Sequence, residues 1–107
     1  MSLRDEKIAE VLVHLAANFI AREAGRETLI TPTRATLGKG AKTATIFVSV
    51  FPEHDTPHAL EFLARHRDDF RTLMKKEARL STLPQVTFAE DVGERNRQHL
   101  DEISRDL

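Results

Sequence analysis

The stretch TATIFVSVF, residues 43–51, alternates apolar with more polar side chains and is rich in β-branched residues, which is typical of a strand. One face of this strand carries Ala44, Ile46, Val48 and Val50, and the other carries Thr43, Thr45, Phe47, Ser49 and Phe51. A similar segment precedes it at residues 28–37, and the intervening GKGAK predicts a hairpin. Pro32 lacks the N–H that a sheet ladder needs, so the first strand is expected to be an edge strand there, or to start after Pro32.

Residues 5–24 show the clearest helical periodicity in the chain. Apolar residues at i, i+3, i+4, i+7, i+8, i+11 and i+12 form one stripe, made of Ile8, Val11, Leu12, Leu15, Ala16, Phe19 and Ile20. Asp5 and Glu6 lie where the positive end of the helix dipole would be, and Gly25 directly follows the last periodic residue. A helix over residues 5–24 is therefore predicted, with both ends marked.

Two further apolar stripes follow the hairpin and are separated by the polar residues 65–69. Thr56 is interpreted as a helix N-cap, with Pro57 at the first helical position. The stripes comprise Leu60, Leu63 and Ala64 before the polar stretch and Phe70, Leu73 and Met74 after it. Either one long helix runs through residues 65–69, or a first helix ends there and Asp68 or Asp69 caps a second.

The last part of the chain predicts a short third strand and a helical tail. Pro84 ends the helical region, and residues 85–88 alternate as a strand does. Asp91 or Gly93 is expected to begin a closing helix. Its apolar residues are few, namely Leu100, Ile103 and Leu107. We therefore expect the tail to pack weakly.

The length of 107 residues fits a single domain, with a core expected over residues 5–90 and a weakly packed tail helix over residues 91–107. A composition of 40% hydrophobic and 31% charged residues is typical of a globular protein and excludes the membrane-spanning and disordered classes. Cysteine is absent, which excludes disulfides, thiol nucleophiles and cysteine metal sites. Residues 1–7 have mixed charge and no signal-peptide pattern, so a cytoplasmic location is expected.

The order of predicted elements is helix, strand, strand, helix, helix, strand and tail helix. Three strands with helices between them bury one sheet face, so the fold class is α+β, a two-layer sandwich. This order is the one used by type II KH domains, a fold associated with single-stranded RNA. A regular KH domain holds RNA with a GXXG loop between its two middle helices, and residues 65–69 contain no glycine.

Three patches resemble a known family. ATIFVSV, residues 44–50, is similar to the second strand of that family; Phe70-Arg71 followed by Leu80 is similar to its third helix and exit. LPQVTFAED, residues 83–91, with Glu94-Arg95 after it, is similar to the family stretch P-x-L-x-F-x-x-D and is the most specific of the three. The family is bacterial ribosome-binding factor A, a small KH-like protein without the GXXG loop.

The resemblance runs from about Lys7 to Ile103 and includes two departures. Family members usually have an Ala-x-Gly kink between the middle helices, where this chain has His66-Arg67-Asp68. Their Asp-Leu before the second strand is replaced by Gly40-Ala41, so the chain resembles a divergent member. The resemblance implies an assembly factor and not an enzyme, acting as a monomer on the rRNA of the small ribosomal subunit during its late maturation, with no cofactor and no membrane contact.

A basic segment is the main candidate for RNA contact, because residues 65–79 hold six bases against three acids. In a helix, Arg71, Lys75 and Arg79 would stand at i, i+4 and i+8 and form one ridge able to neutralise phosphates. The same pattern is typical of a solvated helix face, and the resemblance favours RNA. The candidate RNA-binding residues are Arg65, Arg67, Arg71, Lys75, Lys76, Arg79, Lys39 and Lys42.

Other candidate sites have simpler explanations. His54 and His58 have ligand character, but Pro57 at a helix start removes the i, i+4 geometry that two metal-binding histidines would share. The pair Glu90-Asp91 is interpreted as part of a helix cap and not as an acid–base pair. The sequence therefore predicts no catalytic site and no metal site.

A protein-interaction module is the alternative function. Phe47 and Phe51 share the strand face opposite Val48, and one face of the sheet is expected to be open. Such a face could pair with a second copy or with another protein. Residues 90–107 also carry six acids against three bases, and this acidic tail is interpreted as repelling RNA from the rest of the molecule.

Overall fold

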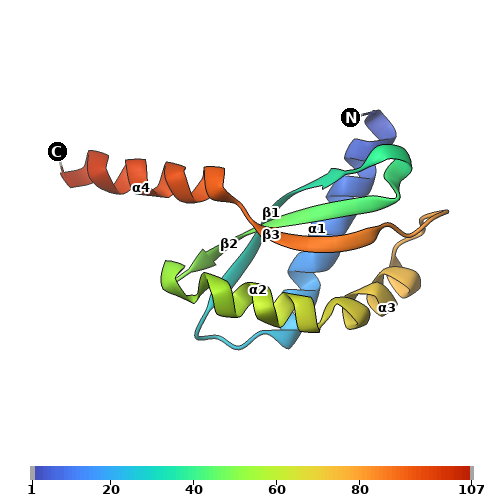
Figure 1. Ribbon diagram of the computed structural model, residues 1–107, viewed down its shortest axis with the longest axis horizontal. Helices are drawn as coiled ribbons and strands as arrows, with labels where there is room; N and C mark the ends of the chain where they lie inside the picture. Colours follow the sequence, from blue (N-terminus) through green and yellow to red (C-terminus); the bar gives the residue numbers. More distant parts are fainter. Residues whose placement is uncertain (1, 107) are drawn as a thin grey trace.

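The computed structural model describes residues 2–106, with side chains described for residues 2–103, and it confirms the predicted α+β class and element order (Figure 1). The helices are α1 (Leu3–Glu23), α2 (Thr56–Arg65), α3 (Arg67–Glu77) and α4 (Val92–Asp106). The strands are β1 (Leu29–Leu37), β2 (Thr43–Phe51) and β3 (Gln85–Glu90). Short 3₁₀ turns, η1 (Lys39–Ala41) and η2 (Glu53–Asp55), flank β2. None of the described helices is long and apolar enough to cross a membrane.

The sheet has the strand order β1-β2-β3, with β2 antiparallel to β1 and parallel to β3. Leu29 pairs with Phe51 at one end of the hairpin, and Thr43 pairs with Gln85 where β2 and β3 begin. Pro32 lies within β1, and the register shifts between Pro32 and Arg34. The first of the two alternatives for Pro32 is therefore confirmed, because β1 is an edge strand that contains it.

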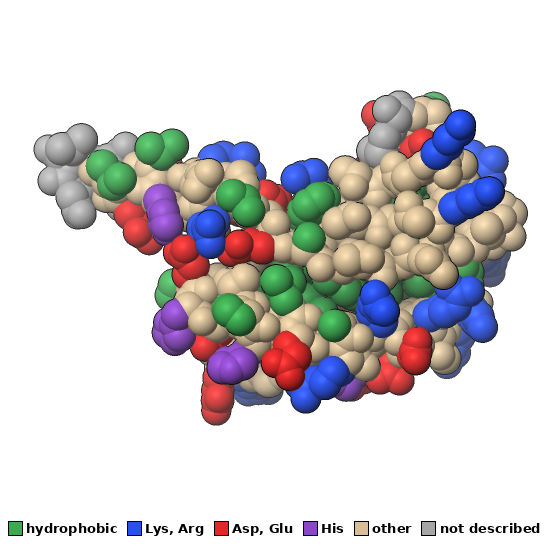
Figure 2. Space-filling view, viewed as in Figure 1, with side chains coloured by type: hydrophobic (Ala, Val, Ile, Leu, Met, Phe, Trp, Pro, Cys, Tyr) green, Lys and Arg blue, Asp and Glu red, His purple; other side chains and the backbone are tan. Residues whose placement is uncertain are grey.

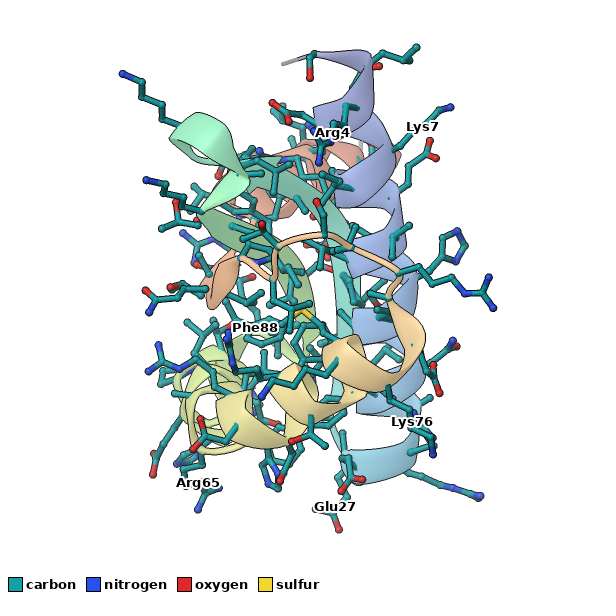
Figure 3. The ribbon with its side chains drawn as sticks, turned by 90° about the vertical axis from the view of Figure 1, so that its right-hand side faces the viewer. Arg4, Lys7, Glu27, Arg65, Lys76 and Phe88 are labelled. Carbon is teal, nitrogen blue, oxygen red and sulfur yellow. The ribbon has the colours of Figure 1, made fainter. Side chains whose placement is uncertain are left out.

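The hydrophobic core lies between the sheet and the helices α1, α2 and α3, which cover one face of the sheet (Figures 1 and 3). The largest fully buried apolar side chains include Phe70, Leu12, Ile46, Leu63, Met74 and Val48. Phe70 makes edge-to-face contacts with Phe19 and Phe88, at ring-centroid distances of 5.5 and 5.6 Å. These contacts join α1, α3 and β3. The odd-numbered residues of β2 lie on the opposite, open face.

The two middle helices are separate, and His66 stands between them with φ −99° and ψ 13°. The prediction that Asp68 or Asp69 caps the second helix is wrong, since α3 begins at Arg67 and both aspartates lie in its first turn. Asp69 instead contacts the His66 ring, at 3.0 Å from Nδ1. That ring also packs on Phe62, with 4.4 Å between centroids. Ring packing therefore marks the break where the family has a glycine kink.

The cap predicted at Thr56 is also wrong. Asp55 precedes α2 without a side-chain cap bond, and Thr56 is the first helical residue, whose Oγ1 donates to the carbonyl of Glu53 at 2.6 Å. The prediction fails because η2 supplies a carbonyl that the Thr56 hydroxyl reaches more directly than an amide of its own helix. Pro57 does occupy the first turn, as expected.

Helix α4 begins directly after β3 and extends away from the body of the molecule (Figure 1). Asp91 precedes it, and its Oδ1 accepts a hydrogen bond from the backbone N–H of Glu94 at 3.0 Å, which confirms the predicted cap. Leu100 and Ile103 are 63% and 58% exposed, so the apolar residues of α4 are not covered by the rest of the chain. Leu107, predicted to join them, lies outside the described residues.

Candidate RNA interface

A basic ridge runs along α3. Arg67, Arg71 and Lys75 follow one another at i, i+4 and i+8 and are all exposed. Arg67 and Arg71 line a small groove of 280 Å³ together with Pro84 and the first residues of β3. The ridge predicted from the sequence therefore exists, but it is shifted by one helical turn toward the start of α3.

Arg79 does not belong to this ridge, and the prediction of its place is wrong. The helix ends at Glu77 because Ala78, which is buried, turns to an extended conformation with φ −85° and ψ 120°. Arg79 then lies in the connection to β3, where it lines a groove of 810 Å³ with Arg4 and Lys7 from the start of α1.

Arg4 and Lys7 are two further cations beside Arg79, and no local sequence pattern singles them out. Arg4 donates from Nη2 to Oγ of Ser81 at 3.1 Å, which ties the start of α1 to the connection after α3 (Figure 3). In the sequence, Arg4 and Lys7 flank Asp5 and Glu6, so this helix start has no excess of basic residues that would indicate an anion-binding site. Only the tertiary fold brings these two residues beside Arg79.

The remaining two bases of the basic segment lie apart from the ridge. Figure 3 shows Arg65 at the end of α2 and Lys76 on the side of α3 that faces the later turns of α1, with the two side chains pointing away from each other. Both are exposed. They could contact phosphates only if RNA extends around α3 in both directions.

The hairpin turn adds two lysines at the same end of the molecule as the ridge. The backbone carbonyl of Lys42 accepts a hydrogen bond from the N–H of Gln85 at 2.9 Å, so the turn adjoins the start of β3. Lys39 lies in η1, which closes through left-handed backbone at Gly40 and Ala41, with φ 69° and 56°. Figure 2 shows lysine and arginine gathered at the right of the view, over the hairpin turn and α3.

All eight predicted cations are exposed. Within the described part of the chain, none of them lies within 4.0 Å of a carboxylate as an ion pair. The ion pairs that are present lie mostly around α4, where Arg95 contacts Glu53 and Glu90. An anion approaching the basic end would therefore meet cations that are solvated and unpaired.

A second polar centre joins α4 to the sheet. The Asp91 side chain is only 3% exposed, and its Oδ2 accepts a hydrogen bond from Oγ1 of Thr33 at 2.6 Å. Arg34 lies 3.5 Å from the same oxygen. The hydrogen bond from Thr33 lowers the pKa of the Asp91 carboxyl below its ordinary value. Burial acts in the opposite direction and raises this pKa, whereas the N–H of Glu94 and the charge of Arg34 lower it further. Asp91 is thus a structural anion.

The histidines considered as metal ligands and the phenylalanines considered for protein contact lie in ordinary structural environments. His54 is 82% exposed and lies 3.4 Å from Asp55, which accepts a hydrogen bond from Thr28 at 2.9 Å. Among the described residues, no cluster of three or more His, Asp or Glu side chains could hold a metal ion. Phe47 is covered by the guanidinium of Arg34, 3.8 Å from the ring centroid, whereas Phe51 is 72% exposed.

Comparison with known proteins supports the resemblance seen in the sequence. A family model described as "Ribosome-binding factor A" matches residues 4–104. The ribosome-binding factor A of Kosmotoga olearia is 31% identical over 93 residues, which cover 86% of this chain and 74% of that protein.

Solved structures share the fold. The crystal structure of ribosome-binding factor A from Thermus thermophilus superposes with a TM-score of 0.70 at 21% identity, covering 80% of this chain and 94% of that one. A homology model of the Thermus thermophilus factor, fitted into the cryo-EM map of its complex with the 30S subunit, gives a TM-score of 0.68 at 21% identity, covering 79% and 92%.

Proposed function

The chain belongs to the ribosome-binding factor A family, and on that premise we propose that it binds the small ribosomal subunit and assists the maturation of that subunit. It does so as a non-enzymatic factor, through contacts with rRNA. The cytoplasm, where ribosomal subunits are assembled, is the compartment that this role requires.

The observation that carries the proposal is the set of exposed cations at one end of the fold, for which the described residues provide no ion-pair partner. The ridge of Arg67, Arg71 and Lys75 forms its centre, with Lys42 beside it across the start of β3. Such side chains displace counterions from the phosphate backbone, so affinity depends steeply on salt concentration. Phosphate contacts position a protein without reading sequence, and specificity then comes from the shape of the rRNA.

The other predicted cations extend this surface in different directions. Arg79 lies toward the start of α1, as does the η1 turn that contains Lys39, while Arg65 and Lys76 lie on either side of α3. We assign the main contact to the ridge and Lys42, and a supporting role to these four. The groove lined by Arg67 and Arg71, and the separate groove lined by Arg4, Lys7 and Arg79, are concave places where a phosphate backbone can approach two or more cations at once.

Sedimentation with purified small subunits tests the proposal. The double variant Arg71→Glu with Lys75→Glu should lose co-sedimentation at low salt, where the unchanged protein binds. Its matched control is Arg22→Glu with Arg26→Glu, which makes the same change in net charge at two exposed positions outside the ridge, in and just after the last turn of α1. Equal loss of binding in both variants, or unchanged binding in the ridge variant, would remove the ridge from the interface.

A further inference from the structure

We propose that the groove between α4 and the open face of the sheet is a second interaction surface, and that its occupant is a cationic, partly apolar segment of another protein. The groove has a volume of 640 Å³ and is lined by β1, β2 and α4. It involves none of the eight cations assigned to RNA, so the two surfaces are separate.

The floor of the groove is apolar and accessible. Leu29 and Phe51 are direct cross-strand partners on the open face, 64% and 72% exposed. The two side chains therefore form a small exposed apolar patch at this end of the groove. The neighbouring pair on the same face, Thr31 and Ser49, continues the floor with small polar side chains.

The wall of the groove is acidic. Helix α4 contributes Glu94, Gln98, Asp101 and Glu102, which follow one another at i, i+4, i+7 and i+8 and share one side of the helix. Arg97 offsets the charge of Glu94, with Nε at 3.2 Å from the carboxylate. Asp101 and Glu102 have no ion pair among the described residues, and no lysine or arginine lines the groove.

The wall is held in place from its other side. Arg95 contacts Glu53 at 3.4 Å and Glu90 at 3.2 Å, and His99 lies 2.7 Å from Glu53. Together with the buried Asp91 at its start, these contacts fix α4 at an angle to the sheet and keep the groove open without an occupant. A preformed groove binds a partner at a lower entropic cost than one that must first order.

Charge complementarity selects the occupant. Asp101 and Glu102, which have no ion pair among the residues whose side chains are described, disfavour nucleic acid, and a purely acidic or uncharged peptide gains nothing from them. A segment with lysine or arginine beside leucine, isoleucine or phenylalanine satisfies both the wall and the floor. Figure 2 shows acidic side chains near the base of α4 mixed with Arg and His, whereas lysine and arginine predominate at the opposite end of the molecule.

Peptide binding to the purified protein tests the proposal in the absence of ribosomes, so its outcome is independent of subunit binding. The probe is a short fluorescein-labelled peptide of alternating lysine and leucine, measured by fluorescence anisotropy. Peptides of alternating glutamate and leucine, and of alternating lysine and serine, serve as comparisons. We expect the lysine–leucine peptide to bind at least about tenfold more tightly than either of them.

Variants locate the site. Asp101→Lys with Glu102→Lys should weaken binding about tenfold, and Phe51→Ser should do so separately, because charge and apolar contact are both needed. The matched control is Glu10→Lys with Glu61→Lys, an equal charge change on exposed positions of α1 and α2. Thermal unfolding of each variant confirms that it is folded.

Several results would overturn the proposal. They are equal weakening by the control pair, no effect of Phe51→Ser, or NMR chemical-shift changes that lie outside residues 29–33, 49–51 and 94–102. Self-association of the protein at the concentrations used, seen by sedimentation equilibrium and abolished by Phe51→Ser, would assign the groove to a second copy instead.

Discussion

Replacing Asp91 with asparagine should lower the free energy of unfolding by about 2 kcal/mol. The buried carboxylate accepts hydrogen bonds from Thr33 at 2.6 Å and from the N–H of Glu94 at 3.0 Å. A hydrogen bond to a charged acceptor contributes about 1.5–3 kcal/mol, and a neutral one about 1 kcal/mol. Asparagine retains one acceptor oxygen and turns an NH₂ group toward one of the two donors. Alanine, which also abolishes the cap, should cost about 3 kcal/mol.

The effect should depend on pH in one direction. The pKa of Asp91 is lowered in the folded protein, so the folded state favours the ionised form. Its contribution to stability is therefore complete above the ordinary pKa of 3.8 and is lost as the pH falls toward and through the lowered value. The difference in stability between the unchanged protein and Asp91→Asn should be constant near neutral pH and should shrink below about pH 4.

Urea unfolding followed by circular dichroism at a series of pH values measures this difference directly. Asp101→Asn, which removes an exposed carboxylate of the same helix, is the matched control and should change stability by less than about 0.5 kcal/mol. The reasoning fails if Asp91→Asn is as mild as the control at pH 7, or if its cost grows as the solution is acidified.

Two further predictions concern packing. Phe70→Ala should lower the free energy of unfolding by about 3–5 kcal/mol, because Phe70 is fully buried. Phe51→Ala, on the open face, should change it by less than about 0.5 kcal/mol. Similar values for both variants in urea unfolding would contradict the assigned core. His66→Ala should lower the free energy of unfolding by about 1–2 kcal/mol, because the ring packs on Phe62 and contacts Asp69. If the alanine variant is as stable as the unchanged protein, the break between α2 and α3 does not depend on the ring.

Much of the fold could be predicted from local patterns. The strand over residues 43–51 has the predicted bounds, because strict alternation and the flanking glycine and proline mark both of its ends. The first helix was predicted within two residues at its start for a similar reason, since its stripe is long and regular. Both elements have patterns that tertiary contacts reinforce and do not override.

The boundaries that failed are those decided by distant residues. The end of α3 carries no glycine or proline, and Ala78 leaves the helix where its side chain becomes buried in the core. At the start of α3 the His66 ring packs on Phe62 and on Phe19 of α1. The helix begins at Arg67, so both aspartates already lie inside it. Neither the burial of Ala78 nor the contact of His66 with Phe19 can be inferred from spacing along the chain.

The candidate site was predictable where it depends on helical periodicity and not predictable where it depends on contacts between distant residues. The exposure of the basic residues around α3 follows from helical periodicity, and it is confirmed; their contact with RNA stays a prediction. Arg4 and Lys7 were missed because they join Arg79 only through the packing of α1 against the connection after α3. The acidic character of α4 could be predicted from the composition of the tail, but the position of its acidic side beside the sheet could not.

The interruption of β1 at Pro32 has a consequence for how copies of this protein behave when crowded together. An edge strand with a continuous row of free amides and carbonyls can template pairing with the edge of another sheet, which leads to polymers. Here a missing N–H and a shift of register between Pro32 and Arg34 break that row in its middle. The β1 edge is therefore a poor template for pairing with the sheet of a neighbouring molecule.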